Sequence, residues 1–488
     1  MNFTNHQSDA VSMQSAFLRE TRHPAGTWAL CVAGLRPFFP ILLILATLLL
    51  ARPAAALQTA PALPSQSATV AALQKRVEVL EREVQQLQQE LQQRQGTAAA
   101  SPVSSSPAPA APAPAAAPAP PSPAASLLPS GTTLNVLLDG YYSWNLNRPL
   151  NRTNQLRSFD QTENGFSLSQ AALVLERAPD LATGRRFGAR LDLQFGQAAE
   201  FLQGNSANEP RPQVYRNIYQ AYGTYIVPLG KGLTVDFGKW ASSLGEEGAY
   251  NKDQINASRS FLYTFLPAYH EGLRATYPVS SWMSLSGWLV NGLNQTEDFN
   301  GFKSEAVALE LQPSQHLSWT LNYYTGQENA QVIPPAGPGT APVLAPTPDG
   351  REHIADTYAT WTPNSRTTLS TEWDYAVTRQ LSQSAPQHLF GSAAYFRYQL
   401  TPRWALGTRG EYVADPDGLF SGMSQDLKEI TATLDFKPAD GFMLRSEWRR
   451  DFTNRPFFQT QSPGLLAGQQ TTFSGTVLWW FGEKKGAW

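Results

Sequence analysis

Residues 186–195 read RFGARLDLQF, in which Phe, Ala, Leu, Leu and Phe alternate with Arg, Gly, Arg, Asp and Gln. Because successive side chains of a β-strand point to opposite faces, this order predicts a strand with one polar and one apolar face. The same split recurs in residues 403–412, 427–436 and 444–448. The charges gather on one face and Leu, Val, Phe, Trp and Tyr on the other. A soluble β-sandwich or propeller also alternates, but it would carry its charges outside and its apolar side chains inside.

Sixteen segments of this kind follow residue 133. They start near Leu134, Phe166, Arg185, Tyr215, Leu233, Ala268, Trp282, Phe302, Leu317, Glu352, Thr367, His388, Arg403, Leu427, Phe442 and Thr471. Tight connections such as 228–231 and 278–281 alternate with long polar ones such as 145–165 and 241–266. An even strand count with short and long connections in alternation predicts a transmembrane barrel. The fold class is therefore all-β, a 16-stranded antiparallel transmembrane β-barrel preceded by a short α-helical coiled coil and a Pro/Ala-rich linker.

The barrel must close, because no water in the hydrocarbon layer can satisfy an open sheet edge. The last strand is therefore expected to pair with the first. Residues 471–481 have the aromatic character of a closing strand, and the chain ends on Trp488. This resembles the C-terminal signal of outer-membrane barrels, but residues 482–487 separate the strand from the terminal aromatic.

The residues before the barrel form four further segments. Three arginines precede a 14-residue apolar run, residues 38–51, and small residues follow it at 54–56, which predicts a signal peptide over 1–56. A short linker covers 57–67. Residues 68–95 predict a coiled-coil helix, with an apolar seam of Val70, Leu73, Val77, Leu80, Val84, Leu87 and Leu91. Residues 96–130 are an Ala/Pro/Ser-rich spacer, and the barrel covers 131–488.

Composition excludes several classes of function. The chain of 488 residues has 37 Lys+Arg against 39 Asp+Glu, so we expect no nucleic-acid partner, which would need a concentrated basic surface. One Cys permits neither a disulfide framework nor a thiolate metal site. No apolar run reaches the roughly 20 residues of a membrane-spanning helix. We expect no cofactor and no bound metal.

The chain resembles the OmpL-like beta-barrel porin family (beta-barrel porin 2) over roughly residues 134–488. The resemblance depends on ordered short motifs, namely 141–142 with 147–149, 157–160, 166–168, 238–240, 245–247, 258–260, 267–274 and 290–292. It implies a porin-like outer-membrane pore with no agreed substrate. The coiled coil and the spacer lie outside it.

Strand phase assigns charges to the interior of the barrel. Seven cations and ten anions fall on the polar face: Arg186, Arg190, Arg274, Arg397, Arg409, Arg445 and Arg449, with Asp192, Asp236, Glu310, Asp356, Glu372, Asp374, Glu411, Glu429, Asp435 and Glu447. The long connection 241–266 is the candidate constriction. Candidate pore-lining or constriction residues are Arg190, Asp192, Glu246, Glu247, Asp253, Arg259, His270, Arg274, Glu372, Asp374, Arg409, Glu411, Arg445, Glu447 and Arg449. An ion pair between Arg148 and Asp160 is expected to brace the first long connection.

Three functions are compatible with these features. A porin would pass small hydrophilic solutes and ions by diffusion, sit in outer-membrane lipid and form a trimer or dimer. An envelope tether would use the coiled coil, in the periplasm, to reach peptidoglycan or another periplasmic partner. A barrel enzyme would need a Ser/His or Asp/His constellation, and the four histidines of the mature chain, His270, His316, His353 and His388, lie in no recognisable motif. The porin is the preferred interpretation, and an enzyme is not expected.

Overall fold

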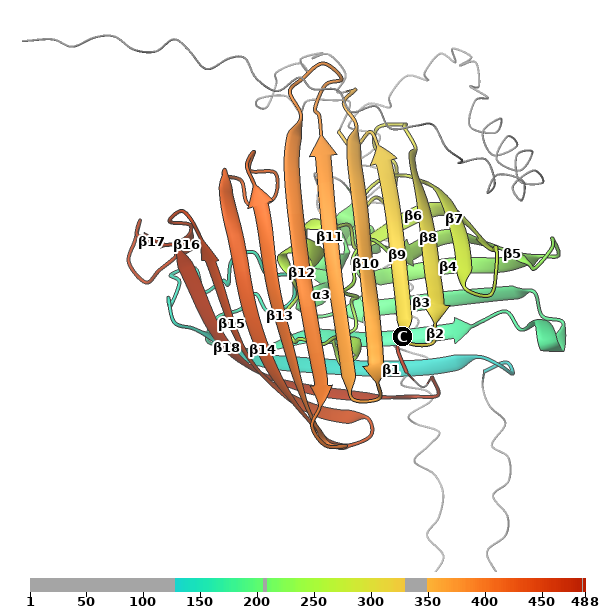
Figure 1. Ribbon diagram of the computed structural model, residues 1–488, viewed down its shortest axis with the longest axis horizontal. Helices are drawn as coiled ribbons and strands as arrows, with labels where there is room; N and C mark the ends of the chain where they lie inside the picture. The colour runs from blue at the N-terminus through green and yellow to red at the C-terminus, as the bar shows by residue number, and fades with distance from the viewer. Residues whose placement is uncertain (1–127, 205–208, 330–348, 485) are drawn as a thin grey trace, which may run out of the picture. The chain divides into compact units, whose positions relative to one another are not determined.

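The computed structural model describes residues 128–204, 209–329, 349–484 and 486–488. The predicted signal peptide, linker, coiled-coil helix and nearly all of the spacer lie outside these residues. Within the described part the chain forms a closed antiparallel barrel (Figure 1). No helix in that part is long and apolar enough to cross a bilayer.

Sixteen strands make the barrel. They are β1 (Thr133–Asn145), β2 (Gly165–Arg177), β3 (Phe187–Phe195), β4 (Ile218–Val227), β5 (Leu233–Ala241), β6 (Tyr269–Pro278), β7 (Met283–Val290), β8 (Ser304–Ser314), β9 (Leu317–Gly326), β10 (Glu352–Asn364), β11 (Thr367–Thr378), β12 (Gln387–Gln399), β13 (Trp404–Asp415), β14 (Gln425–Ala439), β15 (Phe442–Thr453) and β18 (Gln469–Gly482). All sixteen segments expected from the alternation are present. Two short strands, β16 (Phe458–Gln459) and β17 (Leu466–Ala467), form a separate hairpin in the connection between β15 and β18.

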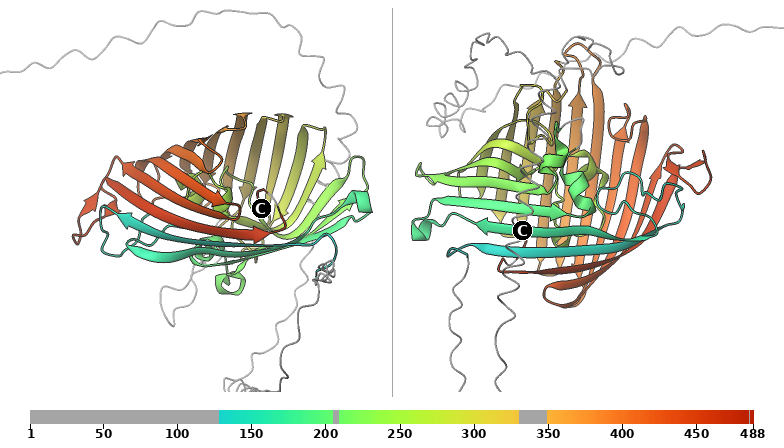
Figure 2. Two further views of the ribbon diagram at one scale, coloured as in Figure 1. Left: turned by 90° about the horizontal axis from the view of Figure 1, so that it is seen from below. Right: turned by 180° about the vertical axis from the view of Figure 1, so that it is seen from behind.

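The first and last strands close the barrel, as expected. β1 pairs with β18 from Asn135 opposite Gly482 to Asn145 opposite Thr472, and it pairs with β2 on its other side. The views in Figure 2 show these strands side by side at the lower edge of the barrel. Closure leaves neither strand with an unpaired edge, which is the condition for a sheet in hydrocarbon.

Short and long connections alternate around the barrel. The short ones join β2 to β3, β4 to β5 and so on to β14 and β15, and they define what is called here the short-turn end. β1 starts and β18 finishes at this end. The long connections carry the helices: α3 (Gln197–Leu202) and α4 (Pro212–Tyr215) between β3 and β4, and η2 (Asn251–Asp253) and α5 (Phe261–Phe265) between β5 and β6. The single exception is η1 (Leu181–Thr183), between β2 and β3.

At the long-loop end an ion pair joins two of the long connections. Arg211, beside α4, donates its Nε to Glu297 Oε2 at 2.7 Å, and Glu297 belongs to the connection between β7 and β8. The Arg211 hydrogen bond, with a second one from Tyr215, lowers the pKa of Glu297 to about 2. Both partners are accessible to solvent, so the pair links the two connections at modest energy.

The two faces of the sheet differ as the alternation requires. On β3, Phe187 and Phe195 are 69% and 46% exposed, whereas Asp192 and Gln194 are 0% and 1% exposed. Aromatic pairs lie on the outer face near both ends, for example Trp404 with Phe436 at the short-turn end. Other outer-face pairs are Phe442 with Trp479 at that end, and Tyr142 with Phe166 and Trp144 with Phe473 at the other. Two aromatic rims around an apolar band are typical of a barrel embedded in lipid.

The two faces of β8 offer a matched test of this orientation. Val307 is 52% exposed on the outer face, and Glu310 is exposed on the inner face of the same strand. We expect Val307→Arg to lower the free energy of unfolding in lipid vesicles by more than about 1 kcal/mol, because a guanidinium that faces hydrocarbon is poorly solvated. Glu310→Arg should change it by less than about 1 kcal/mol. Equal costs for the two variants would contradict the assigned faces.

Candidate functional site

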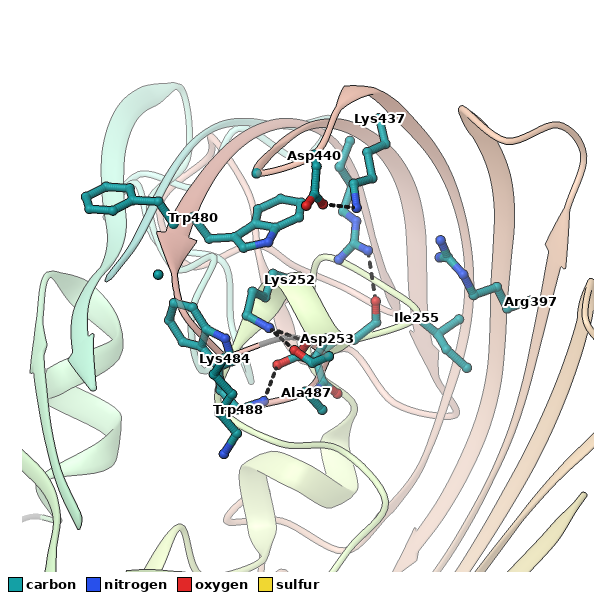
Figure 3. A pocket seen from close by; sticks show the side chains of 16 residues that line it. Lys252, Asp253, Ile255, Arg397, Lys437, Asp440, Trp480, Lys484, Ala487 and Trp488 are labelled. Carbon is teal, nitrogen blue, oxygen red and sulfur yellow. Dashed lines mark hydrogen bonds and ion pairs between the residues drawn. The ribbon is translucent and has the colours of Figure 1, made fainter. Parts of the chain in front are cut away.

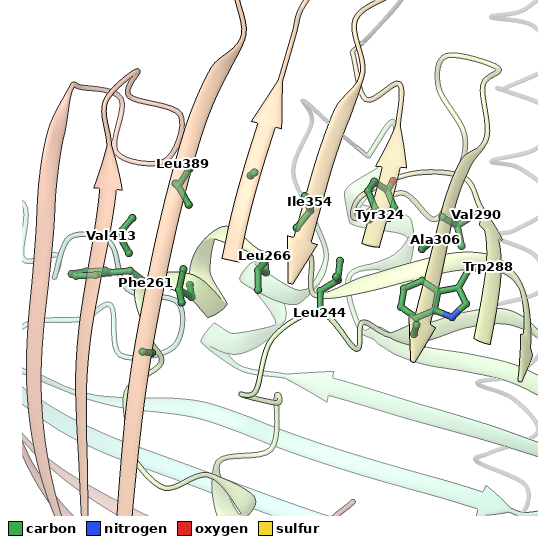
Figure 4. Close-up of a cluster of buried hydrophobic side chains, with 14 of the residues drawn as sticks. Leu244, Phe261, Leu266, Trp288, Val290, Ala306, Tyr324, Ile354, Leu389 and Val413 are labelled. Carbon is green, nitrogen blue, oxygen red and sulfur yellow. The ribbon is translucent and has the colours of Figure 1, made fainter. Parts of the chain in front are cut away.

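The connection between β5 and β6, residues 242–268, lies inside the barrel and is called here the inner segment. Figure 4 shows α5, within this segment, beside the inner faces of the strands. Its backbone and side chains bond to inward-facing residues of β10, β13, β14 and β15, which lie on the opposite side of the barrel from β5. The segment therefore crosses the interior from one wall to the other.

Two wall carboxylates bind the backbone of the inner segment. Glu447 on β15 accepts the N–H groups of residues 257–258 at 2.6 and 2.9 Å. Glu411 on β13 accepts those of residues 261–262, at the start of α5, at 2.8 and 2.7 Å. The first N–H groups of a helix have no partner inside the helix, so a carboxylate there satisfies donors that would otherwise be buried unpaired.

Arg445 on β15 binds the other side of the same backbone. It donates to the carbonyl oxygens of Asn251, Gln254 and Asn256 at 3.1, 2.8 and 3.0 Å. Its Nε donates to Asp435 at 2.7 Å, so its charge is balanced although the side chain is buried. A guanidinium has five donors in a fixed plane, which suits it to hold a turn of backbone in one conformation.

Arg409 and Arg449 complete the contact. Arg409 pairs with Glu429 of the wall and with Glu247 of the inner segment, both at 2.6 Å, and donates to the Ser258 carbonyl at 2.8 Å. Arg449 donates to the Ser258 hydroxyl at 3.3 Å and to the carbonyl oxygen of residue 259. These predicted wall charges therefore bind protein groups of the inner segment.

Apolar packing also fixes the segment. Leu244, Phe261, Leu262 and Leu266 pack in one cluster with inward-facing apolar residues of the wall (Figure 4). The wall members include Trp288, Ile354, Leu389, Val413 and Leu427. Burial of each large side chain of the segment contributes about 1.5–3 kcal/mol. The expectation that apolar strand residues face only lipid is thus incomplete, because those beside the inner segment face inward.

The remaining predicted residues of the segment bond to its own backbone, to a neighbouring lysine or to the wall. Arg259 is 0% exposed and donates to the carbonyls of residues 248, 249 and 257 at 3.0, 3.2 and 3.1 Å. Glu246 accepts from the Thr360 hydroxyl on β10 at 2.7 Å. Asp253 accepts from Lys252 at 2.6 Å. Arg259 is therefore a buried residue that holds the backbone of the segment, and it does not line the pore.

His270 is fully buried on β6. Its Nε2 lies 3.1 Å from Ser242 Oγ and its Nδ1 lies 3.4 Å from the Gly292 carbonyl. Its ring lies between those of Trp288 and Tyr324, with centroids at 5.4 and 5.6 Å. In these surroundings it is a hydrogen-bonded packing residue.

The predicted charges of β3, β5 and β6 form pairs along the wall. Arg190 binds Asp192 at 2.9 Å, and Arg274 binds Asp236 at 2.8 Å. Asp192 also accepts from the hydroxyl of Tyr250, a residue of the inner segment. Tyr250 did not stand out in the sequence, since nothing local to it indicates a partner 58 positions away in the chain.

The predicted ion pair between Arg148 and Asp160 is wrong. Asp160 pairs instead with Arg157, at 2.7 Å, and Arg157 also binds Asp451 on β15 at 2.7 Å. Arg148 lies in a tight turn with a positive φ of 48°. Arg157 is the first residue of the motif at 157–160, which the sequence indicates, but its partner on β15 is distant in sequence.

The chain end also lies beside the inner segment. The Trp488 N–H donates to Asp253 at 3.1 Å, and the Trp488 ring lies 5.7 Å from that of Tyr250. A cavity of about 560 Å³ adjoins it at the short-turn end, lined by several cations (Figure 3). On β18, Phe481 is the last outward aromatic and is 63% exposed. The terminal aromatic therefore does not belong to the closing strand.

None of the four histidines forms a catalytic arrangement with an acid in the described part of the chain. His353 and His388 each bond a tyrosine hydroxyl at 2.8 Å, on Tyr323 and Tyr375, and His316 lies 2.9 Å from the Thr362 carbonyl. No ion pair joins a histidine to a carboxylate among those residues.

Residues 131–481 match the family model described as "Putative beta-barrel porin-2, OmpL-like". The chain belongs to this family. Its membership in a porin family, together with the closed barrel, makes it an outer-membrane channel protein. No curated protein matches the chain.

Solved porin structures share little sequence with this family member. The anion-selective porin from Comamonas acidovorans is 10% identical, with a TM-score of 0.46 over 72% of this chain and 99% of that one. The channel DcaP of Acinetobacter baumannii is 10% identical, with a TM-score of 0.46 over 72% and 97%. OmpT of Vibrio cholerae, folded in vitro, is 10% identical, with a TM-score of 0.47 over 73% and 99%.

Removing the carboxylates that hold the inner segment should widen the pore of this porin-family barrel. In Glu411→Gln with Glu447→Gln, each side chain keeps its size but can accept through one oxygen only, which costs about 1–3 kcal/mol per lost charged bond. We expect larger and noisier single-channel currents in planar bilayers. The control is Glu310→Gln, an exposed inward carboxylate that makes no hydrogen bond to the segment among the described residues. Currents unchanged in the double variant would show that the segment needs neither carboxylate.

Proposed function

We propose that the protein is a porin whose water-filled channel passes small hydrophilic solutes and ions by diffusion, with the inner segment as its constriction. The observation that carries this proposal is the attachment of residues 242–268 to the opposite wall through Glu411, Glu447, Arg409 and Arg445. A barrel of sixteen strands leaves an aqueous interior unless something fills it. A segment fixed across that interior narrows the channel inside the closed sheet.

Selectivity in this proposal arises from the field of the wall. Strand phase assigns seven arginines and ten carboxylates to the interior, which predicts a mildly anionic wall. Many of these charges neutralise one another in pairs, such as Arg409 with Glu429 and Arg445 with Asp435. Paired charges contribute little net field, so ions should be sorted weakly rather than bound.

Two parts of the proposal concern residues and contacts beyond the barrel itself. The channel is proposed to be a trimer or dimer in outer-membrane lipid. The coiled coil at 68–95 and the spacer at 96–130 are proposed to extend into the periplasm toward peptidoglycan or another partner. Because a tether and a pore use different parts of the chain, the two roles are compatible.

The proposed path of solutes can be tested at Gly248, an exposed residue of the inner segment. A Cβ there would meet only the flexible end of Gln254, at 3.3 Å, so Gly248→Cys is tolerated. We expect a charged, water-soluble methanethiosulfonate reagent to lower the single-channel conductance of this variant by about half or more, because the adduct occupies the constriction. The control, Thr183→Cys in η1, should bind the reagent with no loss of conductance. Full labelling at residue 248 without a change in conductance would contradict the proposal.

The charge balance makes a second prediction. In a tenfold gradient of KCl, we expect a reversal potential of the sign that reports a weak preference for K⁺. A strong preference for Cl⁻ would contradict the assigned wall charges, while a purified, folded barrel that never conducts would contradict the channel itself.

A further inference from the structure

Three buried carboxylates meet at one point of the wall behind the inner segment. They are Asp356 on β10 and Glu372 and Asp374 on β11, each at most 3% exposed. One oxygen of each lies within 4.8 Å of the others. Asp356 also accepts the Gly245 N–H at 2.9 Å, so the group touches the inner segment directly.

These three carboxylates contrast with the buried acids of the barrel that bind a cation. Asp435, Glu429 and Asp451 each bind an arginine at 2.6–2.7 Å. Among the residues that the structure describes, no Lys, Arg or His lies within ion-pair distance of Asp356, Glu372 or Asp374. Burial of unpaired carboxylates is costly, and buried charges are normally paired or bound to metal.

Several oxygen atoms of this group and of the residues next to it have no hydrogen-bond partner among the described residues. Both carboxylate oxygens of Asp374 and Oε1 of Glu372 accept no hydrogen bond among the described residues, nor does the buried hydroxyl of Ser243 in the inner segment. Asn322 on β9 contributes a further oxygen atom without a partner. It is 6% exposed, its Nδ2 bonds Asp356 Oδ2 at 2.6 Å, and its Oδ1 has no partner in the described part.

The register of the sheet explains this convergence. Asn322, Asp356 and Asp374 are directly opposite one another on the adjacent strands β9, β10 and β11. Directly opposite side chains of a sheet lie about 4.5–5.5 Å apart at Cβ. The inner segment covers the row through Ser243, whose carbonyl accepts from Asn322 Nδ2 at 2.9 Å, and through Gly245. A Cβ at Gly245 would lie 3.1 Å from Glu372 Oε1, and its φ of +91° favours glycine.

We propose that Asp356, Glu372, Asp374 and Asn322 bind a calcium ion that fastens the inner segment to the wall. Hard oxygen donors without nitrogen or sulfur suit Ca²⁺ or Mg²⁺. Ca²⁺ binds six to eight oxygens at about 2.3–2.6 Å in flexible geometry, so ligand oxygens up to about 5 Å apart can share it. Mg²⁺ needs strict octahedral geometry and retains waters, which a site this enclosed accommodates poorly. The ion would neutralise two of the three negative charges and hold residues 243–245 in place.

The first experiment uses the folded barrel in detergent after dialysis against EDTA. Isothermal titration with CaCl₂ and luminescence of bound Tb³⁺, sensitised by nearby Tyr358 and Tyr395, report occupancy. We expect one Ca²⁺ per chain and a thermal unfolding midpoint that EDTA lowers and Ca²⁺ restores. Failure of the wild-type barrel to bind Ca²⁺ at millimolar concentration would overturn the proposal.

Matched variants locate the site. Asp374→Asn should weaken Ca²⁺ binding at least tenfold, whereas Asp180→Asn, which removes an exposed carboxylate beside η1, should leave it unchanged. If Asp374→Asn does not fold, Asn322→Asp provides the same information with an added ligand charge, and it should tighten binding. If Asp374→Asn folds, or failing that Asn322→Asp, an unchanged affinity for Ca²⁺ in that variant would overturn the assignment of the site.

Shared protons are the other way to neutralise the group. In that case the stability of the wild-type barrel would be the same in EDTA and in Ca²⁺, would fall as pH rises, and would increase in Asp374→Asn with or without the metal. That combination would also overturn the calcium site. Conductance is not needed for any of these measurements, so the inference can fail or succeed independently of the proposed channel.

Discussion

The structure depends on the lack of hydrogen-bonding partners in hydrocarbon. Every N–H and C=O of a segment that crosses the bilayer must be paired within the protein, and a sheet achieves this only by closing on itself. The pairing of β1 with β18 is therefore the contact on which the other fifteen strand pairings depend. It also decides where everything else lies, because a closed sheet has one face toward lipid and one toward the interior. Strict alternation of side chains follows directly, and so does the aromatic character of the two rims.

The same rule governs the inner segment, although it lies inside the barrel and not in the lipid. Much of its backbone is irregular and buried against the wall, so its polar groups need partners that secondary structure does not supply. Charged wall residues supply them: carboxylates of Glu411 and Glu447 accept N–H groups, and the guanidinium of Arg445 donates to three carbonyls. Such bonds are stronger than neutral ones. Charge on the inner face is thus a means of attaching a loop, and the inward apolar residues around Phe261 add packing to it.

Much of this fold could be predicted from the sequence, because strand phase is a local property. Residues 186–195 fix their own two faces, and all sixteen strands and the closing pair followed from repetition of that pattern. The site could be predicted only in part. Glu411, Arg445 and Arg449 were placed on the inner face by phase, but that Arg445 binds the carbonyls of 251, 254 and 256 depends on how a loop folds 190 residues away, which no local pattern encodes. The bracing pair was assigned to Arg148 for the same reason, since the actual donor, Arg157, is recognised only through its contact with Asp451 on β15.

The acidic group behind the inner segment shows what register adds to phase. Phase alone places Asp356, Glu372 and Asp374 on one face but does not say which residues of adjacent strands are opposite one another. A shift of two residues between β10 and β11 would keep every side chain on its face and still separate Asp356 from Asp374 by about 7 Å. In the actual register the three carboxylates and Asn322 meet, next to the point where Gly245 lets the backbone approach. Unlike charges accumulate easily along a wall, because each pair stabilises itself. A group of like charges persists only where something neutralises it, so the position of this group at the foot of the inner segment indicates that its neutralisation and the fixing of the segment are one event.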